Sequence, residues 1–226
     1  MILNIYKKAA AVLLRKPILL WGLSLLSSII TGLAVPACGI IPVVGVVVAM
    51  LLGTSMTMVY LHGYRGEKIK SSMLFECFKS WATIKRVSCG LGWMILWLIV
   101  WSMVPFVGPI IALVKFYGWR LTPYILVYEP NVPIMDAIKV SAKRTKGYKG
   151  KMLGADLLVY GILIVAGLLL TLLSQIPFIG ILFGFANVLV TIVSVLFLNL
   201  FMGLVQSAFY EEINANRAKA QIPENV

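Results

Sequence analysis

The chain has 226 residues, of which 61% are hydrophobic and only 12% are charged, and its formal net charge is +12. A soluble domain normally carries about 25% charged residues and its helices keep a polar face, so the long uncharged runs of this chain exclude a soluble protein. A transmembrane β-barrel is also excluded. Its strands would alternate apolar and polar residues in segments of about ten, whereas residues 161–173 are almost continuously aliphatic.

Three long stretches supply the predicted spans. Residues 17–64 and 157–210 contain no Lys, Arg, Asp or Glu, and residues 87–128 contain only Lys115 and Arg120. A helix rises about 1.5 Å per residue, so about 20 residues cross the hydrocarbon core and each stretch is long enough for two crossings. The sequence therefore predicts an all-α polytopic membrane protein with six transmembrane helices, arranged as three helical hairpins.

A short motif recurs at the uncharged break within each predicted hairpin. It reads Ile-Pro-Val-Val-Gly, Val-Pro-Phe-Val-Gly and Ile-Pro-Phe-Ile-Gly, and its conserved positions are Pro42 and Gly45, Pro105 and Gly108, and Pro177 and Gly180. Proline begins or ends a helix because it lacks an amide hydrogen, and glycine permits a tight reversal. We expect each motif to form the turn between two spans.

The regions around the hairpins also repeat. A basic amphipathic stretch precedes each hairpin, at residues 2–16, 71–86 and 133–151, and is predicted to be a helix lying in the membrane interface. A tyrosine shortly before an acid follows each hairpin, at Tyr64, Tyr128 and Tyr210, as expected of an interfacial anchor. The chain is thus interpreted as one integral membrane domain, residues 1–226. It comprises three pseudo-repeated units at approximately 1–67, 68–129 and 130–212, and a cytoplasmic tail, 213–226.

The distribution of charge predicts the orientation. Basic residues gather before each hairpin, and the breaks within the hairpins carry no charge. Lysine and arginine favour the cytoplasmic side, so both termini are predicted to be cytoplasmic in a multi-pass protein of the cell membrane. This placement accounts for the net charge without nucleic acid and predicts anionic headgroups as partners. Residues 7–35 resemble a signal peptide, but Pro36 suits a cleavage site poorly, so an uncleaved first span is expected.

Stripes of small residues indicate helix packing in the first hairpin. Gly45, Ala49 and Gly53 recur every four positions, followed by Thr57, and a second stripe contains Ser24, Ser28 and Gly32. Small side chains let helix backbones approach closely where lipid offers no hydrophobic driving force. Gly150 with Gly154 and Gly180 with Gly184 have the same spacing. We interpret these stripes as packing surfaces rather than ligand sites.

A few polar residues within the spans are the candidates for function, since charge in the bilayer core is costly. Counting along the helices places Arg120 roughly 13 Å and Asp156 roughly 7 Å from the inner surface. With Asn199 they are predicted to form a buried polar cluster. This cluster either holds the spans together or has a conducting or binding role. Lys115 is expected to reach the outer headgroups by snorkelling, with Asn187 as a neighbour at similar depth.

The second half of the chain resembles a known family. Residues 120–130 read Arg-Leu-Thr-Pro-Tyr-Ile-Leu-Val-Tyr-Glu-Pro, and Ala137, Ser141, Lys146, Gly147 and the closing Phe209-Tyr210-Glu211-Glu212 follow. This pattern is similar to that of uncharacterised bacterial six-helix integral membrane proteins related to the membrane domain attached to some glycerophosphodiester phosphodiesterases. The chain departs from it at Tyr128-Glu129-Pro130, where an Asp-Asn-Pro type sequence is expected. The resemblance implies membrane localisation and fold but no reaction, because the catalytic domain of those phosphodiesterases is a separate barrel.

The sequence offers little for catalysis, and we predict that the protein is not an enzyme and binds neither metal nor cofactor. His62 is the single histidine, the eight acids are scattered, and no zinc-binding helix, nucleophile elbow or phosphate-binding glycine loop occurs. Cys38, Cys77 and Cys89 are interpreted as small apolar residues. Two classes remain: a membrane scaffold or accessory subunit that contacts lipid or a membrane protein partner, and a small transporter or channel. Few polar residues line any span, which favours the scaffold.

Overall fold

The computed structural model describes residues 2–15, 17–37 and 42–221, and within these ranges the chain forms helices and no strand. The elements in chain order are α1 (Ile2–Arg15), α2 (Pro17–Ala37), α3 (Pro42–Arg65), η1 (Ser71–Phe78), α4 (Trp81–Ser102), α5 (Gly108–Trp119), α6 (Thr122–Tyr128), η2 (Ile134–Asp136), α7 (Ala137–Arg144), α8 (Lys149–Leu173) and α9 (Gly180–Gln221). The elements α1 to α9 are α-helices, and η1 and η2 are short 3₁₀ helices.

Five segments are long and apolar enough to cross a membrane: α2, α3, α4, the consecutive pair α5–α6, and α8. The two parts of α9, Gly180–Ser194 and Phe197–Lys219, differ in direction by 42° and make a sixth if they are counted as one span. The chain is therefore an all-α polytopic membrane protein, as the sequence predicts. Helix α9 continues to Gln221 and buries Ile213, so most of the predicted tail is helical.

The packed core lies at one end of the spans. It surrounds residues 200–213 of α9, which contact α1 and α3, while α6 packs between α3, α4 and α7. We call this region the hub: α1, α3, α6, α7 and residues 200–213 of α9, together with Arg86 of α4, residues 117–121 and residues 149–156 of α8, which contact them. Its fully buried side chains include Leu61, Leu121 and Phe209. Helices α9 and α3 approach closely at Gly203, where an added Cβ would lie 2.2 Å from Cε2 of Tyr60, so glycine lets α9 approach α3 there.

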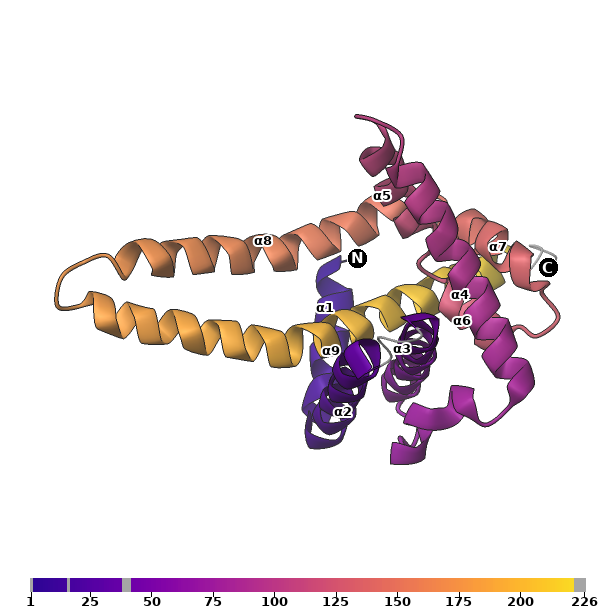
Figure 1. The fold of residues 1–226 in the computed structure, drawn as a ribbon, viewed down its shortest axis with the longest axis horizontal. Coiled ribbons are helices and arrows are strands. Elements are labelled where there is room, and N and C mark those ends of the chain that lie inside the picture. The colour runs from indigo at the N-terminus through magenta and orange to yellow at the C-terminus, as the bar shows by residue number, and fades with distance from the viewer. Residues whose placement is uncertain (1, 16, 38–41, 222–226) are drawn as a thin grey trace, which may run out of the picture.

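The hairpins leave the hub in different directions. Figure 1 shows α8 and the first part of α9 running side by side far beyond the other helices, while α4 and α5 project along another axis. None of the most apolar stretch of α8 is buried, whereas half of that of α3 is. Within the described residues the three hairpins therefore enclose no path between them (Figure 1), and their outer parts expose many apolar side chains.

The α4–α5 and α8–α9 turns have the same backbone geometry. The amide of Val107 donates to the carbonyl of Pro105 (2.7 Å), as that of Ile179 does to Pro177 (2.8 Å), and each bond closes a γ-turn. The residues between these partners, Phe106 and Phe178, adopt left-handed φ values of 59° and 66°. Their rings are 96% and 100% exposed at the tips of the hairpins.

Both turns form at the predicted prolines and glycines, but the glycine, contrary to the prediction, does not itself make the chain reversal. A Cβ on Gly108 would lie 2.4 Å from the carbonyl oxygen of Trp101, and one on Gly180 would lie 2.2 Å from that of Ser174. Glycine therefore permits the second helix to begin directly against the end of the first. Neither glycine has a positive φ; the left-handed residue is the preceding phenylalanine.

The first copy of the motif does not form the turn. Pro42 begins α3, and Gly45 lies buried inside that helix, so the prediction that Gly45 permits the reversal is wrong. Proline fits the first position of a helix because the amide there needs no partner. Residues 38–41, which join α2 to α3 and include Cys38, lie outside the described residues.

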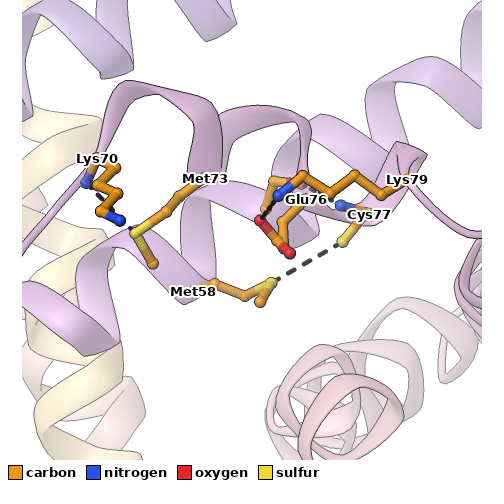
Figure 2. Close-up of polar contacts among 7 residues, drawn as sticks. Met58, Lys70, Met73, Glu76, Cys77 and Lys79 are labelled. Atoms are coloured by element: carbon orange, nitrogen blue, oxygen red, sulfur yellow. Dashed lines mark hydrogen bonds and ion pairs between the residues drawn. The ribbon is translucent and has the colours of Figure 1, made fainter.

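The amphipathic stretches are shorter than predicted. The first is α1, but the second is divided into η1 and the start of α4, because Ser80 is extended, with φ −128° and ψ 129°. The helical part of the third ends at Arg144, and the left-handed Gly147 (φ 85°) separates it from α8. Element η1 packs on α3, where the buried Cys77 thiol lies 4.0 Å from the sulfur of Met58 (Figure 2).

The small-residue stripes pack only at their starts. Gly45 is buried, Ala49 is half-buried and Gly53 is exposed; Ser24 is buried, whereas Ser28 and Gly32 are exposed. The packing predicted for Gly53, Ser28 and Gly32 is therefore wrong. Positions four apart drift by about 40° per step around a helix of 3.6 residues per turn, so each stripe turns away from the neighbouring helix. A Cβ on Gly150 or Gly184 would likewise meet nothing within 4 Å, and one on Gly154 only the Ile2 side chain at 3.8 Å.

Candidate functional site: the polar network of the hub

The fourth span is broken where it enters the hub. Helix α5 ends at Trp119 and α6 begins at Thr122, and Pro123 has no amide hydrogen to continue the helical ladder. The carbonyl of Gly118 accepts hydrogen bonds from the hydroxyls of Ser141 (2.9 Å) and Thr145 (2.9 Å) on and just after α7. A backbone break at this depth needs such partners because lipid supplies none.

Two further bonds complete the support of the break. The amide of Leu121 donates to Oγ of Ser141 (3.2 Å), and Nε2 of Gln206 on α9 donates to the carbonyl of Arg120 (2.9 Å). Elements α7 and α9 thus fix the course of the fourth span. The break also aims the Arg120 side chain towards α8.

Arg120 and Asp156 meet within this network. Nη1 of Arg120 lies 2.6 Å from Oδ2 of Asp156, and the hydroxyl of Tyr117 donates to the same oxygen at 2.9 Å. The two charged side chains are 12% and 11% exposed, and the guanidinium lies 5.5 Å from the centre of the Tyr117 ring. Oδ1 of Asp156 is buried with no hydrogen-bond partner among the described residues. The pair neutralises both charges and ties α5 to α8.

The predicted third member of this cluster is elsewhere. Asn199 is exposed on α9, so its assignment to the buried cluster is wrong. Gln206 occupies that place instead, seven residues further along the same helix. Seven residues are almost two full turns, so both side chains lie on a similar face, but they differ by about 10 Å in depth. The prediction counted residues along straight helices, and it therefore selected Asn199, which lies further from the hub than Gln206.

A second ionic layer lies at the end of the fourth span. Arg144 of α7 makes a bidentate pair with the carboxylate of Glu129, and its side chain is 11% exposed. Arg86 of α4 donates to three backbone carbonyls, those of Leu126 (2.8 Å), Glu129 (2.7 Å) and Val132 (2.6 Å). Arginine suits this position because its planar guanidinium offers five donors in fixed directions. The loop after α6 is therefore held from two sides.

A further ion pair joins the first and last hairpins. Nη2 of Arg65 lies 2.7 Å from Oε1 of Glu211, and its guanidinium also lies 5.8 Å from the centre of the Tyr128 ring. Beside it the rings of Tyr124 and Tyr210 stack with centroids 4.5 Å apart. Two of the tyrosines expected to anchor the chain in the interface thus contact neighbouring helices of the hub.

Lys115 and Asn187, which the sequence predicts to be neighbours at the ends of the spans away from the hub, lie apart. The Lys115 ammonium lies 5.5 Å and 5.8 Å from the ring centres of Trp101 and Trp119. Nδ2 of Asn187 donates to the hydroxyl of Thr171 at 3.0 Å and so links α9 to α8. Asn187 is not a neighbour of Lys115, because the second and third hairpins diverge (Figure 1).

Metal-binding geometry is not seen in the described ranges, where no three His, Cys, Asp or Glu side chains come close enough to hold an ion. His62 pairs with Glu67 at the end of α3. No family model, no curated protein and no solved structure matches the chain. The network must be interpreted from its own geometry.

Sequence reasoning missed the roles of Arg86, Glu129 and Arg144. Arg86 and Arg144 belong to the basic stretches that the sequence assigns to the membrane interface, and Glu129 is the acid that follows the predicted anchor Tyr128. A signal was present for one of the two arginines: Glu129 is followed by Pro130, which ends the span, and Arg144 is the first arginine after that point, whereas Arg120 lies between Arg86 and Glu129. Their pairing nevertheless depends on the direction in which α4 and α7 leave the loop.

Proposed function

We propose that the protein is a membrane scaffold or accessory subunit, with a rigid hub and three hairpins that project into the bilayer to contact the spans of partner membrane proteins. One observation carries the proposal. The charged and polar groups near the broken span are used in internal pairs, while the hairpins leave the hub as separate pairs of helices with many exposed apolar side chains.

The internal pairing argues against conduction. A transport path needs polar side chains that can exchange partners with a moving ligand. Arg120 and Gln206 are engaged in the structure of the break, and Arg144 is held by both oxygens of Glu129. Such groups resist rearrangement because each loses a partner when it moves.

In the proposed orientation, the hub and both termini lie at the cytoplasmic side of the cell membrane. The basic residues gather at the hub ends of the spans, as expected for the cytoplasmic side. A labelling experiment tests this with single cysteines in a variant that lacks Cys38, Cys77 and Cys89. In intact cells a membrane-impermeant maleimide should label Ser174→Cys and leave Lys219→Cys unlabelled until the membrane is opened. The reverse pattern would invert the topology.

Photo-crosslinking tests the scaffold itself. A photoreactive phenylalanine at Ile164, which is 61% exposed on α8, should give discrete adducts with another membrane protein in native membranes. The same group at buried Ala155 is the matched control on the same helix and should give none. Lipid adducts alone at Ile164, together with ion or solute flux through vesicles containing the purified chain, would reject the scaffold in favour of a transporter.

A further inference from the structure

A basic hollow opens beside the hub where α7, the turn into α8 and the last turns of α9 meet. It has a volume of about 570 Å³. Six polar or charged side chains line it: Lys143, Arg144, Lys146, Tyr148, Asn216 and Arg217. No acidic side chain lines it within the described residues. A hollow of this size accommodates a small ligand, and its charge selects an anion.

The donors in the hollow are of two kinds. Lys143, Lys146 and Arg217 are exposed and form no ion pair with any acid that the structure describes. Arg144 is instead fixed in place by Glu129, which neutralises it but also gives its guanidinium a defined direction. The net charge available to a ligand therefore comes from three exposed cations beside one guanidinium that Glu129 holds in place.

Tyr148 adds an oriented donor. Nδ2 of Asn216 donates to the Tyr148 hydroxyl oxygen at 2.8 Å, and this bond leaves the hydroxyl hydrogen to be donated elsewhere. The ammonium of Lys151 lies 5.2 Å from the centre of the same ring. The tyrosine is thus held between α8 and α9 with its hydroxyl at the hollow.

The position of the hollow identifies the kind of anion. Tyr148 immediately precedes α8, which is long and apolar enough to span the membrane, so the hollow lies at the level where lipid phosphates lie. We propose that it binds the phosphate-bearing headgroup of an anionic phospholipid from the leaflet on the hub side. This inference deepens the proposed scaffold by naming the lipid contact of its cytoplasmic side and rests on that orientation.

Lipid titration of the whole chain in detergent micelles, followed by native mass spectrometry, tests the assignment. The probe is phosphatidylglycerol, with phosphatidylcholine as the neutral lipid. In K143Q/K146Q/R217Q the apparent affinity for phosphatidylglycerol should fall by about tenfold or more, because each cation near an anionic headgroup contributes. In the control K7Q/K68Q/K70Q, which removes the same charge from exposed positions away from the hollow, the fall should stay below about twofold.

A conservative substitution controls for misfolding of the triple variant. Tyr148→Phe removes one hydroxyl and no charge, and its affinity for phosphatidylglycerol should fall by about two- to fivefold with no change for phosphatidylcholine. Equal losses in the hollow and control triple variants would overturn the proposal, because they would show diffuse attraction. No loss in either hollow variant would overturn it as well.

A competition arm separates a lipid from a soluble source of phosphate. Glycerol phosphate should not displace the lipid at concentrations comparable with it, because it lacks acyl chains. Complete displacement under those conditions would assign the hollow to a soluble phosphomonoester and overturn the lipid proposal. The scaffold fails by a different result, the absence of protein adducts at Ile164, so the two failures are distinguishable.

Discussion

The hub and the outer part of the third hairpin, residues 157–199, both consist of helices, but these helices are held in place differently. In the hub, residues of α7, α8 and α9 and of the end of α5 meet around a buried ion pair and a broken span. In the outer hairpin, α8 and α9 contact one another, with Asn187 and Thr171 as their polar link, and face outward elsewhere. Apolar composition therefore places a helix in the membrane, whereas a few polar groups and close-packed glycines decide which parts become rigid.

The largest expected effect comes from breaking the buried ion pair. Replacing Asp156 by Ala leaves the Arg120 guanidinium without its counter-charge and should lower the free energy of unfolding by about 3–5 kcal/mol. Denaturant titration of the purified chain in micelles, followed by tryptophan fluorescence, measures it. Leu157→Ala, at the exposed neighbouring position on α8, is the control and should change stability by no more than about 0.5 kcal/mol.

A double-mutant cycle makes this test specific. The cycle compares Arg120→Met, Asp156→Leu and the variant with both substitutions. The double variant should recover much of the loss seen in each single variant, because an apolar pair needs no counter-charge. Additive losses in the double variant would mean that the two residues act independently. The hub would then owe its rigidity to packing alone.

A pair of glycines on one helix gives the next effect. Gly203→Ala places a Cβ 2.2 Å from the Tyr60 ring and should destabilise the hub by about 1–3 kcal/mol. Gly184→Ala, in the outer part of α9, meets nothing within 4 Å and should stabilise the helix by up to about 1 kcal/mol. The same micelle titration serves for both. Equal effects at the two sites would erase the distinction between hub and hairpin.

Substitutions at the turn between α8 and α9 test whether the outer hairpin can be stabilised without any effect on the hub. Phe178→Gly relieves a left-handed backbone at a fully exposed side chain and should stabilise the turn by about 1 kcal/mol. Hydrogen exchange of residues 170–186 should slow by about fivefold, while exchange in the hub should not change. Gly180→Ala is the opposing variant, since its Cβ would strike the Ser174 carbonyl, and it should accelerate the same exchange.

The smallest effect is on the reactivity of two cysteines. Burial raises the pKa of the Cys77 thiol, whereas Cys89 is exposed on α4. A raised pKa lowers the thiolate fraction at any given pH, so alkylation of Cys77 should accelerate only above the pH at which an ordinary thiol titrates. A lipid-soluble maleimide at pH 8 should modify Cys89 first, as peptide mass spectrometry would show. Faster modification of Cys77 would mean that η1 does not stay packed on α3.

The spans and one contact of the site could be predicted from the sequence, because both follow from helical rise. Hydrocarbon thickness fixes where charge-free runs begin and end, and counting residues from the interface placed Arg120 and Asp156 at overlapping depths. The structure brings these two side chains together. The same count failed for Asn199, because it treats a span as straight and does not identify where the packed region ends.

Contacts between segments could not be predicted, because they depend on helix directions that no local pattern fixes. The three carbonyls that accept from Arg86 face it only once the loop after α6 has folded back towards α4. The divergence of the hairpins is of the same kind, since equal composition allows both a closed bundle and separate pairs. The function, the orientation and the likeness of the three units stay predictions.

The order of the hub's partners along the chain has a consequence for biosynthesis. Arg65 is synthesised 146 residues before the Glu211 that binds it, and Arg120 is synthesised 36 residues before Asp156. Both cations are therefore synthesised before their counter-ions exist. The final helix supplies Glu211, the amide that supports the broken span and the ring that stacks on Tyr124. Chains released before this helix is made would keep the earlier spans but would lack these contacts in the core. Membrane quality control could recognise them by this difference.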